Sequence, residues 1–247
     1  MAVRCAVEDD DGRLLVRLSG HLDQRGAADV RIRLLKCLAE QPDAVLVDLS
    51  ALTVDQPLRL TVFAAIAWQA ARWPGIPVLL CAPRPETAAS LNAAAYRRLP
   101  VLPSVAAGRD EARTSRRSLP TVRDDLLPVA GAARHARNLA TEACLRWELP
   151  HLVGPASLVV SELVSNVVEH AHTMMALRLS LWDRYLHIAV RDGSVIEPGL
   201  PDRPTPAQLR GRGLYLVEGT ANSWGCLPTE GGKVVWASLL VDAPAGT

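Results

Sequence analysis

The chain has 247 residues, of which 49% are hydrophobic and 21% are charged, and its formal net charge is +1. This length is enough for one large domain or two small ones, each with a core of its own. A near-neutral chain without a basic stretch gives no electrostatic reason to expect nucleic-acid binding. The five cysteines are scattered without a CxxC pair, which argues against a disulfide framework and a structural zinc site.

The amino-terminal sequence, MAVRCAVEDDDG, has no apolar segment of signal-peptide length. The longest apolar runs, residues 60–71 and 158–168, are shorter than the about 18 residues that a membrane span requires. The sequence therefore predicts a cytoplasmic protein that does not bind membranes.

The amino-terminal part of the chain alternates short apolar runs with segments of helical periodicity. Residues 44–49, AVLVDL, form a nearly continuous apolar run, which predicts a central strand. In chain order, the predicted elements are strand 14–18, helix 27–38, strand 44–49, helix 57–73, strand 76–81, helix 86–95 and edge strand 99–105. This alternation predicts an α/β layer architecture.

The composition changes between Gly108 and Pro128. This stretch is polar, highly charged and nearly free of apolar periodicity, as expected of a linker. We therefore predict two α/β domains, residues 1–108 and 128–247, joined by a linker over residues 109–127.

Helices and a β-hairpin are predicted after this linker. Pro155 suits the first turn of a helix that ends near residue 172. The apolar segments 176–182 and 185–191 are separated by only two residues, which favours a hairpin. The remaining predicted elements are helix 131–147, loop 195–212, a short helix from Gly213, a strand near Trp224, a turn at Gly231-Gly232 and strand 234–241.

The helix that contains ASLVVSELVSNVVEHAH carries two polar residues at the border of its apolar face. Glu162 and Asn166 are four residues apart and therefore lie side by side at that border, with His170 one turn further on. An asparagine oxygen can bind Mg²⁺, and a glutamate can accept a proton in phosphoryl transfer. Taken alone, the pattern is also that of an amphipathic helix with an incidental polar edge.

Two further motifs follow this helix along the chain. Asp192-Gly193 ends an apolar strand, a usual position both for a ligand contact and for a turn aspartate. The segment GRGL at residues 211–214 begins a helix, where glycines allow close backbone approach and free N–H groups favour phosphate. Together with loop 195–212, this order of motifs predicts a nucleotide site beneath a lid.

This ordered set resembles the GHKL ATPase superfamily, whose Bergerat fold is an α/β sandwich shared by histidine kinases, Hsp90, gyrase and MutL. The segments SELVSNVVEHA, VRDGS, GRGLYLVEG and GGKVVW are most similar to the anti-sigma-factor serine kinases. The resemblance implies binding of ATP and Mg²⁺, with Glu162 as the catalytic base and Asn166 as the magnesium ligand. Asp192 would hold the adenine amino group. The other implied nucleotide contacts are Gly193, Gly211, Gly213 and Leu214.

The sequence departs from the family pattern at three positions of this domain. Ser194 and Ile196 stand where the adenine motif carries glycine, and Val234 stands where related sequences often carry threonine. These replacements are expected to weaken nucleotide binding. A histidine kinase is not predicted, because no long dimerising helix with a phosphoacceptor histidine precedes the ATPase-like part; His135 lies in a short predicted helix.

The amino-terminal pattern, LVRLSGHLD, AVLVDLS and ALTVD before a helix, resembles a STAS domain, the fold of anti-sigma-factor antagonists. Such antagonists are substrates of the serine kinases named above and are phosphorylated on the serine of an Asp-Ser pair. The matching residue here is Gln56, which has no hydroxyl group, and Thr53 and Thr61 are poor substitutes by position. The domain is therefore expected either to present a permanently unphosphorylated docking surface, to its own ATPase-like domain or to another protein, or to be a degenerate scaffold.

The leading interpretation is a regulatory ATP-binding protein of partner-switching signalling that acts as an anti-sigma factor and protein serine/threonine kinase. It would transfer phosphate from ATP to a serine of a STAS-type antagonist, with that antagonist or a sigma factor as its partner in transcription regulation. The alternative is a non-catalytic nucleotide-sensing or scaffold protein. The sequence leaves open whether kinase activity is retained and whether the protein forms a homodimer.

Overall fold

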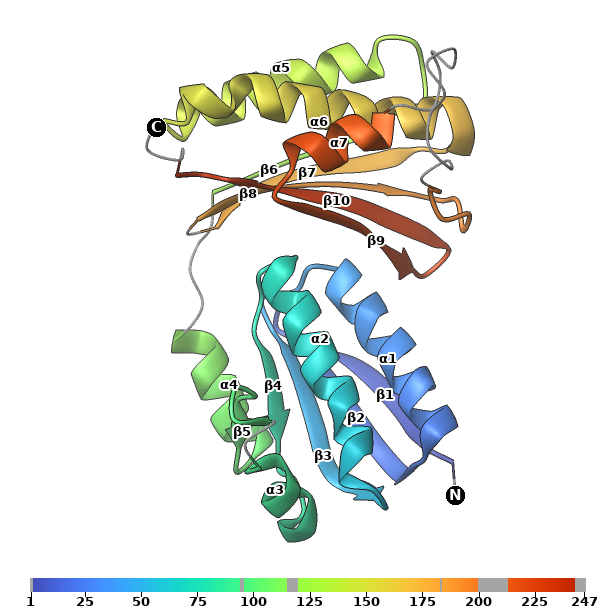
Figure 1. The fold of residues 1–247 in the computed structure, drawn as a ribbon, viewed down its shortest axis with the longest axis vertical. Coiled ribbons are helices and arrows are strands. Elements are labelled where there is room, and N and C mark those ends of the chain that lie inside the picture. The colour runs from blue at the N-terminus through green and yellow to red at the C-terminus, as the bar shows by residue number, and fades with distance from the viewer. Residues whose placement is uncertain (1, 94–95, 115–119, 183, 200–212, 243–247) are drawn as a thin grey trace. The chain divides into compact units, whose positions relative to one another are not determined.

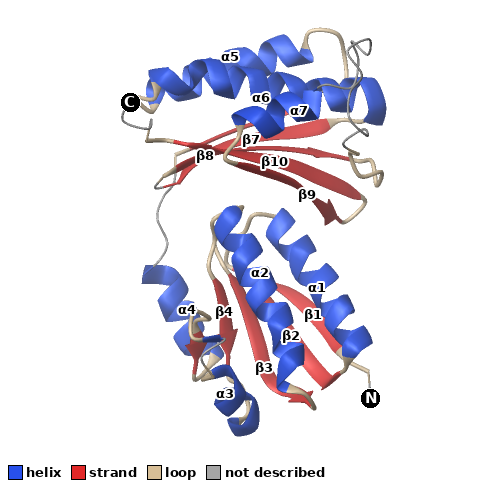
Figure 2. Ribbon diagram, viewed as in Figure 1, coloured by secondary structure: helices blue, strands red, loops and turns tan. Residues whose placement is uncertain are grey.

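The computed structural model describes residues 2–93, 96–114, 120–182, 184–199 and 213–242. The chain divides into two compact units, Met1–Arg117 and Ser118–Thr247, and each is described here by itself. Both units combine one sheet of five strands with helices, so the predicted two-domain α/β class is confirmed (Figures 1 and 2).

The sheet of the first unit has the strand order β1-β2-β3-β4-β5. Its strands are β1 (Arg4–Asp10), β2 (Arg13–Leu22), β3 (Val45–Val54), β4 (Val78–Cys81) and β5 (Val101–Leu102). Strand β1 is antiparallel to β2, and the other neighbours are parallel. The helical elements are α1 (Gln24–Ala39), the 3₁₀ turn η1 (Pro57–Leu60), α2 (Thr61–Arg72), α3 (Pro85–Leu91) and α4 (Val105–Thr114). Each strand and helix predicted before residue 106 is present, but two are clearly shorter than expected. The edge strand predicted over residues 99–105 is limited to β5, and the helix predicted over residues 86–95 ends at Leu91, with residues 94–95 outside the described residues.

Three elements of the chain were not predicted from the sequence. Strand β1 escaped the sequence pattern because its side chains are mostly exposed and polar. The segment predicted as a linker, residues 109–127, contains most of α4 and the whole strand β6 (Thr121–Leu126). The buried residues of helix α4 are the small residues Gly108 and Ala112. Its buried face therefore lacks the large apolar side chains by which a helix is predicted from sequence. Arg109 also bonds its Nε to the Asp10 carboxylate at 3.0 and 3.1 Å.

The sheet of the second unit is antiparallel throughout, with the order β6-β7-β8-β10-β9. The remaining strands are β7 (Met175–Trp182), β8 (Tyr185–Asp192), β9 (Ser223–Thr229) and β10 (Gly232–Leu240). The helical elements are α5 (Ala132–Arg146), the 3₁₀ turn η3 (Pro150–Leu152), α6 (Val153–Asn166), the π-helical turn η4 (Val167–Ala171) and α7 (Gly213–Thr220). The three α-helices cover one face of this sheet, which makes the unit a two-layer α/β sandwich (Figure 1). The predicted hairpin is the pair β7–β8.

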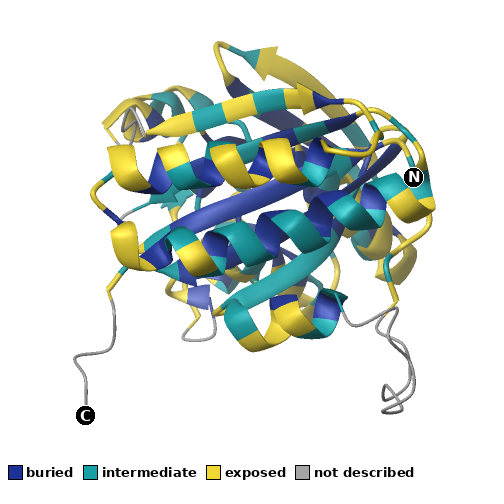
Figure 3. Cartoon of the chain, turned by 90° about the horizontal axis from the view of Figure 1, so that it is seen from above, coloured by how far each residue is buried: buried dark blue, intermediate teal, exposed yellow. Residues whose placement is uncertain are grey.

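Helix α6 is the central element of the core of the second unit. Val159, Val160, Leu163 and Val164 are all buried in one cluster with the inward-facing residues of the sheet. Buried residues recur along helices α5 and α6, between exposed residues in α5 and mostly half-buried residues in α6, as Figure 3 shows. This amphipathic arrangement fixes which edge of α6 is free to line a cavity.

By length and composition alone, the continuous helical segment Pro150–Ala171 is apolar enough to cross a membrane, the one such segment among the described residues. It is longer than the predicted apolar run because η3, α6 and η4 follow each other without a break. Its buried residues pack against the sheet, so the apolar composition is that of a core helix.

Candidate functional site

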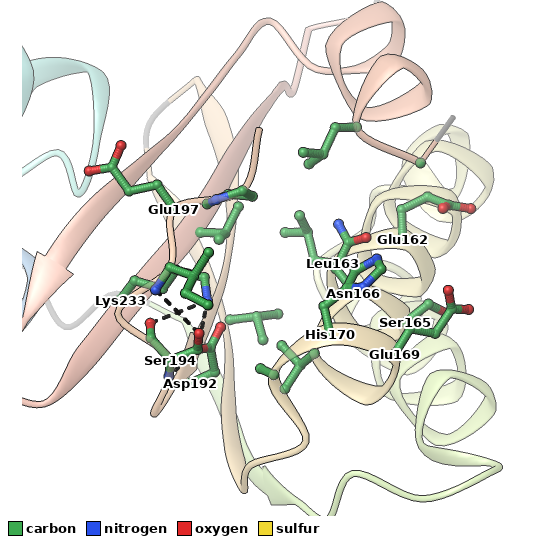
Figure 4. A pocket seen from close by; sticks show the side chains of 18 of the residues that line it. Glu162, Leu163, Ser165, Asn166, Glu169, His170, Asp192, Ser194, Glu197 and Lys233 are labelled. Carbon is green, nitrogen blue, oxygen red and sulfur yellow. Dashed lines mark hydrogen bonds and ion pairs between the residues drawn. The ribbon is translucent and has the colours of Figure 1, made fainter. Parts of the chain in front are cut away.

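A cavity of about 690 Å³ lies between the carboxyl-terminal part of α6 with η4 and the adjoining ends of β8 and β10. The first residues of α7 and the segment after β8 complete its wall. Figure 4 shows polar side chains on both sides of this cavity. Those on the helix side are Glu162, Ser165, Asn166, Glu169 and His170, and those on the strand side are Asp192, Ser194, Glu197 and Lys233.

The helix side of the cavity brings Glu162 and Asn166 together as the sequence predicted. Both side chains are half-buried, because they lie where the apolar face of α6 meets its polar face. Burial raises the pKa of the Glu162 carboxyl above its usual value, and the nearby Glu169 carboxylate raises it further. The π-helical turn η4 follows directly, and such turns occur frequently at functional sites.

The strand side of the cavity contains an ion pair between Asp192 and Lys233. These residues lie opposite each other in the pairing of β8 with β10, and their side chains are 1% and 10% exposed. The Asp192 Oδ1 atom accepts hydrogen bonds from Lys233 Nζ at 2.9 Å and from the Ser194 N–H at 2.7 Å. Lys233 Nζ also donates to the Ser194 carbonyl oxygen at 3.3 Å. Asp192 is therefore a buried carboxylate whose orientation is fixed by two donors.

Lys233 is a residue of this site that sequence reasoning missed. The signal was present, since Lys233 is a single charge at the start of an otherwise apolar strand, directly after Gly231-Gly232. Its meaning depends on β10 pairing with β8, whose last residue is 41 positions away in sequence.

The predicted glycines of the site have different positions in the structure. Gly213 lines the cavity at the start of α7, and a Cβ atom there would overlap the Glu162 carboxylate. Leu214 also lines the cavity and is buried. Gly193 does not line it, and its N–H donates instead to Thr173 Oγ1 at 3.0 Å. The predicted phosphate contact Gly211 and most of the predicted lid lie outside the described residues.

The three departures from the family pattern also have definite positions. Ser194 and Ile196 line the cavity, and Ile196 is 75% exposed. Val234 is fully buried between two cavity-lining residues and does not itself line the cavity. The two glycine replacements are therefore the ones that alter the cavity wall.

In the first unit, Gln56 is exposed and immediately precedes η1. The neighbouring Asp55 carboxylate pairs with His21 Nε2. The hydroxyl groups that remain near Gln56 are already engaged: Thr53 Oγ1 donates to the Gly20 carbonyl at 3.1 Å and Thr61 Oγ1 to the Leu58 carbonyl at 2.7 Å. The surface around Gln56 is therefore polar, but Gln56 itself has no hydroxyl group.

The cavity-bearing unit and the first unit match two different families of known proteins. Residues 128–239 match the histidine kinase-like ATPase domain, and residues 4–108 match the STAS domain. No curated protein sequence matches the chain significantly.

Three solved structures illustrate what the chain is similar to. An anti-sigma factor antagonist from Mycobacterium paratuberculosis is 25% identical, over 46% of this chain and 93% of the antagonist, with a TM-score of 0.37. The antagonist SpoIIAA in its unphosphorylated form is 13% identical, over 45% of this chain and 97% of SpoIIAA, with a TM-score of 0.38. The RsbU and RsbW domains of Rv1364c from Mycobacterium tuberculosis are 19% identical, over 49% of this chain, with a TM-score of 0.38. The match spans 32% of that Mycobacterium tuberculosis chain.

A histidine kinase-like ATPase domain implies ATP binding, usually with Mg²⁺. The donor set fits that group: Asn166 offers one amide oxygen at the cavity wall, and Mg²⁺ in nucleotide sites takes few protein ligands besides phosphates and waters. The chain thus contains a STAS domain followed by a histidine kinase-like ATPase domain.

Proposed function

We propose that this protein is a regulatory, ATP-binding component of partner-switching signalling in the cytoplasm. In this role it acts as an anti-sigma factor and transfers phosphate from ATP to a serine of a separate STAS-type antagonist. The observation that carries the proposal is the cavity in which Glu162 and Asn166 on one wall face the buried Asp192 carboxylate on the other. The STAS domain in the same chain supports the signalling context, because antagonists of anti-sigma factors share that domain class.

Each wall of the cavity has a separate chemical task in this proposal. Asp192 would accept a hydrogen bond from the amino group of adenine, and Asn166 would hold Mg²⁺, which would supply charge neutralisation at the phosphates. Glu162 accepts the proton of the attacking serine hydroxyl. Its raised pKa makes the carboxylate a stronger base than an exposed glutamate, which suits this step.

Nucleotide binding is tested by calorimetry with ATP and Mg²⁺. We expect wild-type protein to bind, and Asn166→Ala to bind about 10- to 100-fold more weakly, because the variant loses a metal ligand. Asn138→Ala is the matched control, since Asn138 is exposed on α5. Absence of binding by the wild type would contradict every nucleotide-based part of the proposal.

Phosphoryl transfer is tested with labelled γ-phosphate and a serine-bearing STAS protein as acceptor. Glu162→Gln keeps the size of the side chain and removes the base, so transfer should fall about 100- to 10,000-fold while ATP affinity changes little. Glu218→Gln, at an exposed position of α7, should transfer at the wild-type rate. Equal rates for Glu162→Gln and wild type would rule out the assigned role of Glu162.

A second candidate function is non-catalytic nucleotide sensing or scaffolding. It is favoured by Ser194 and Ile196 in the cavity wall and by Gln56 in the STAS domain. Binding of ATP by the wild type without any transfer to the STAS acceptor would support this second function over the first.

A further inference from the structure

We infer that Lys233 is a positioning residue that makes the site selective for a 6-aminopurine, such as adenine, over a 6-oxopurine. The inference rests on the proposed nucleotide-binding function and concerns how Asp192 is held. It starts from the position of Lys233 opposite Asp192 in the β8–β10 pairing, at the cavity wall.

The Asp192–Lys233 pair is not explained by stability alone. Removing two charges from water costs free energy that their mutual attraction often only just offsets. This pair is nevertheless almost fully buried and lies at a cavity that has further charged groups on its wall. Its location favours a role in ligand recognition over a role in holding β8 and β10 together, since a backbone ladder already joins these strands along their length.

The two carboxylate oxygens of Asp192 differ in their hydrogen bonds. Oδ1 accepts from both the Lys233 ammonium and the Ser194 N–H. Among the residues that the structure describes, none donates a hydrogen bond to Oδ2. The two bonds to Oδ1 fix the rotation of the carboxylate, so that Oδ2 keeps one orientation and is the acceptor left for a ligand.

The ion pair with Lys233 determines which ligand group Asp192 Oδ2 can bind. Asp192 is the carboxylate partner of an ion pair with the Lys233 ammonium group, and an ionised carboxylate only accepts hydrogen bonds. It therefore matches the amino group at position 6 of adenine, which donates. The oxo group at position 6 of guanine or hypoxanthine also accepts, and facing it with Oδ2 leaves two buried acceptors together, an arrangement that costs free energy.

The test compares the affinities of ATP and ITP, which differ at position 6 of the base, by calorimetry with Mg²⁺. Wild-type protein should prefer ATP by about tenfold or more, the value of one hydrogen bond to a charged group. Lys233→Met keeps the aliphatic stem and removes the ammonium group. It should lose most of this preference, whereas Lys233→Arg keeps the charge and should retain it.

A double variant keeps the inference testable if Lys233→Met alone fails to fold with an unpaired buried carboxylate. Asp192→Asn combined with Lys233→Met has no buried charge, and its carboxamide can both donate and accept. We expect it to bind ATP and ITP within about threefold of each other, since the discriminating acceptor is gone.

The outcomes separate this inference from the proposed function. The inference is wrong, and nucleotide binding stands, if Lys233→Met prefers ATP over ITP by the same factor as the wild type. The same holds if the double variant keeps the wild-type preference for ATP. If the wild type binds neither nucleotide, the proposed function and the inference both fail. A purely structural role of Lys233 would lower both affinities together and leave their ratio unchanged.

Discussion

Gly232→Ala is expected to lower the free energy of unfolding of the ATPase domain by about 3 kcal/mol. A Cβ atom at this position would overlap the carbonyl oxygen of Asp192, which is backbone and cannot rotate aside. To accommodate it, the start of β10 must separate from the end of β8, where Lys233 pairs with Asp192. The change would therefore weaken both the sheet and the cavity wall, and urea denaturation followed by tryptophan fluorescence would measure the loss.

Gly154→Ala is the matched control for this prediction. Gly154 lies in the first turn of α6, and nothing is within 4 Å of the position that a Cβ atom would occupy. Alanine favours a helix over glycine by up to about 1 kcal/mol, so this variant should be as stable as wild type or slightly more stable. If Gly232→Ala and Gly154→Ala had the same denaturation midpoint, the close approach of β10 to the Asp192 backbone would be refuted.

Acidification is expected to destabilise the ATPase domain through His187, by about 2 kcal/mol between pH 7 and pH 5. Burial lowers the pKa of His187 from 6.5 to about 4. The side chain is 2% exposed, and its Nδ1 atom is 2.7 Å from Ser238 Oγ on the neighbouring strand β10. The neutral ring is therefore the form that the folded state accommodates.

The sign of this pH effect on stability follows from proton uptake by the folded and unfolded states. As the pH falls from 6.5 toward 4, the unfolded chain protonates His187 while the folded domain does not, so the unfolded state is favoured. Stability from this residue is fully present above pH 6.5 and is lost progressively down to about pH 4. Denaturation at several pH values within this window would measure the slope.

One variant isolates the contribution of His187 to this pH dependence. His187→Asn retains a side-chain nitrogen near Ser238 but does not titrate, so the pH dependence between 7 and 5 should become shallower by the predicted amount. An unchanged slope in His187→Asn would show that another group controls the acid sensitivity.

Much of the fold could be predicted from local sequence pattern. The apolar run that forms β3, the helical spacing in α1 and the short gap between β7 and β8 each reflect the geometry of a single element or hairpin. The same holds for Glu162 and Asn166, because residues four apart on a helix lie side by side wherever that helix packs. Asp192 was also predictable as a strand-end carboxylate.

The errors arose where a segment is stabilised mainly by distant partners. Strands β1 and β6 are polar edge strands that become strands through pairing with β2 and β7, so their own residues carry little pattern. Helix α4 packs through Gly108, whose missing side chain leaves room for Cys81 and Leu46. Small residues make such packing possible and also hide it from a search for large apolar side chains.

By itself, the sequence determined that the chain has two α/β domains and that one helix carries a glutamate and an asparagine at the border of its apolar face. Only the tertiary structure decided that Glu162 and Asn166 face Asp192 across a cavity, and that Lys233 holds this carboxylate. The physical reason is that backbone geometry sets the spacing within one element. The register between β8 and β10, in contrast, depends on how the whole sheet and its helices pack.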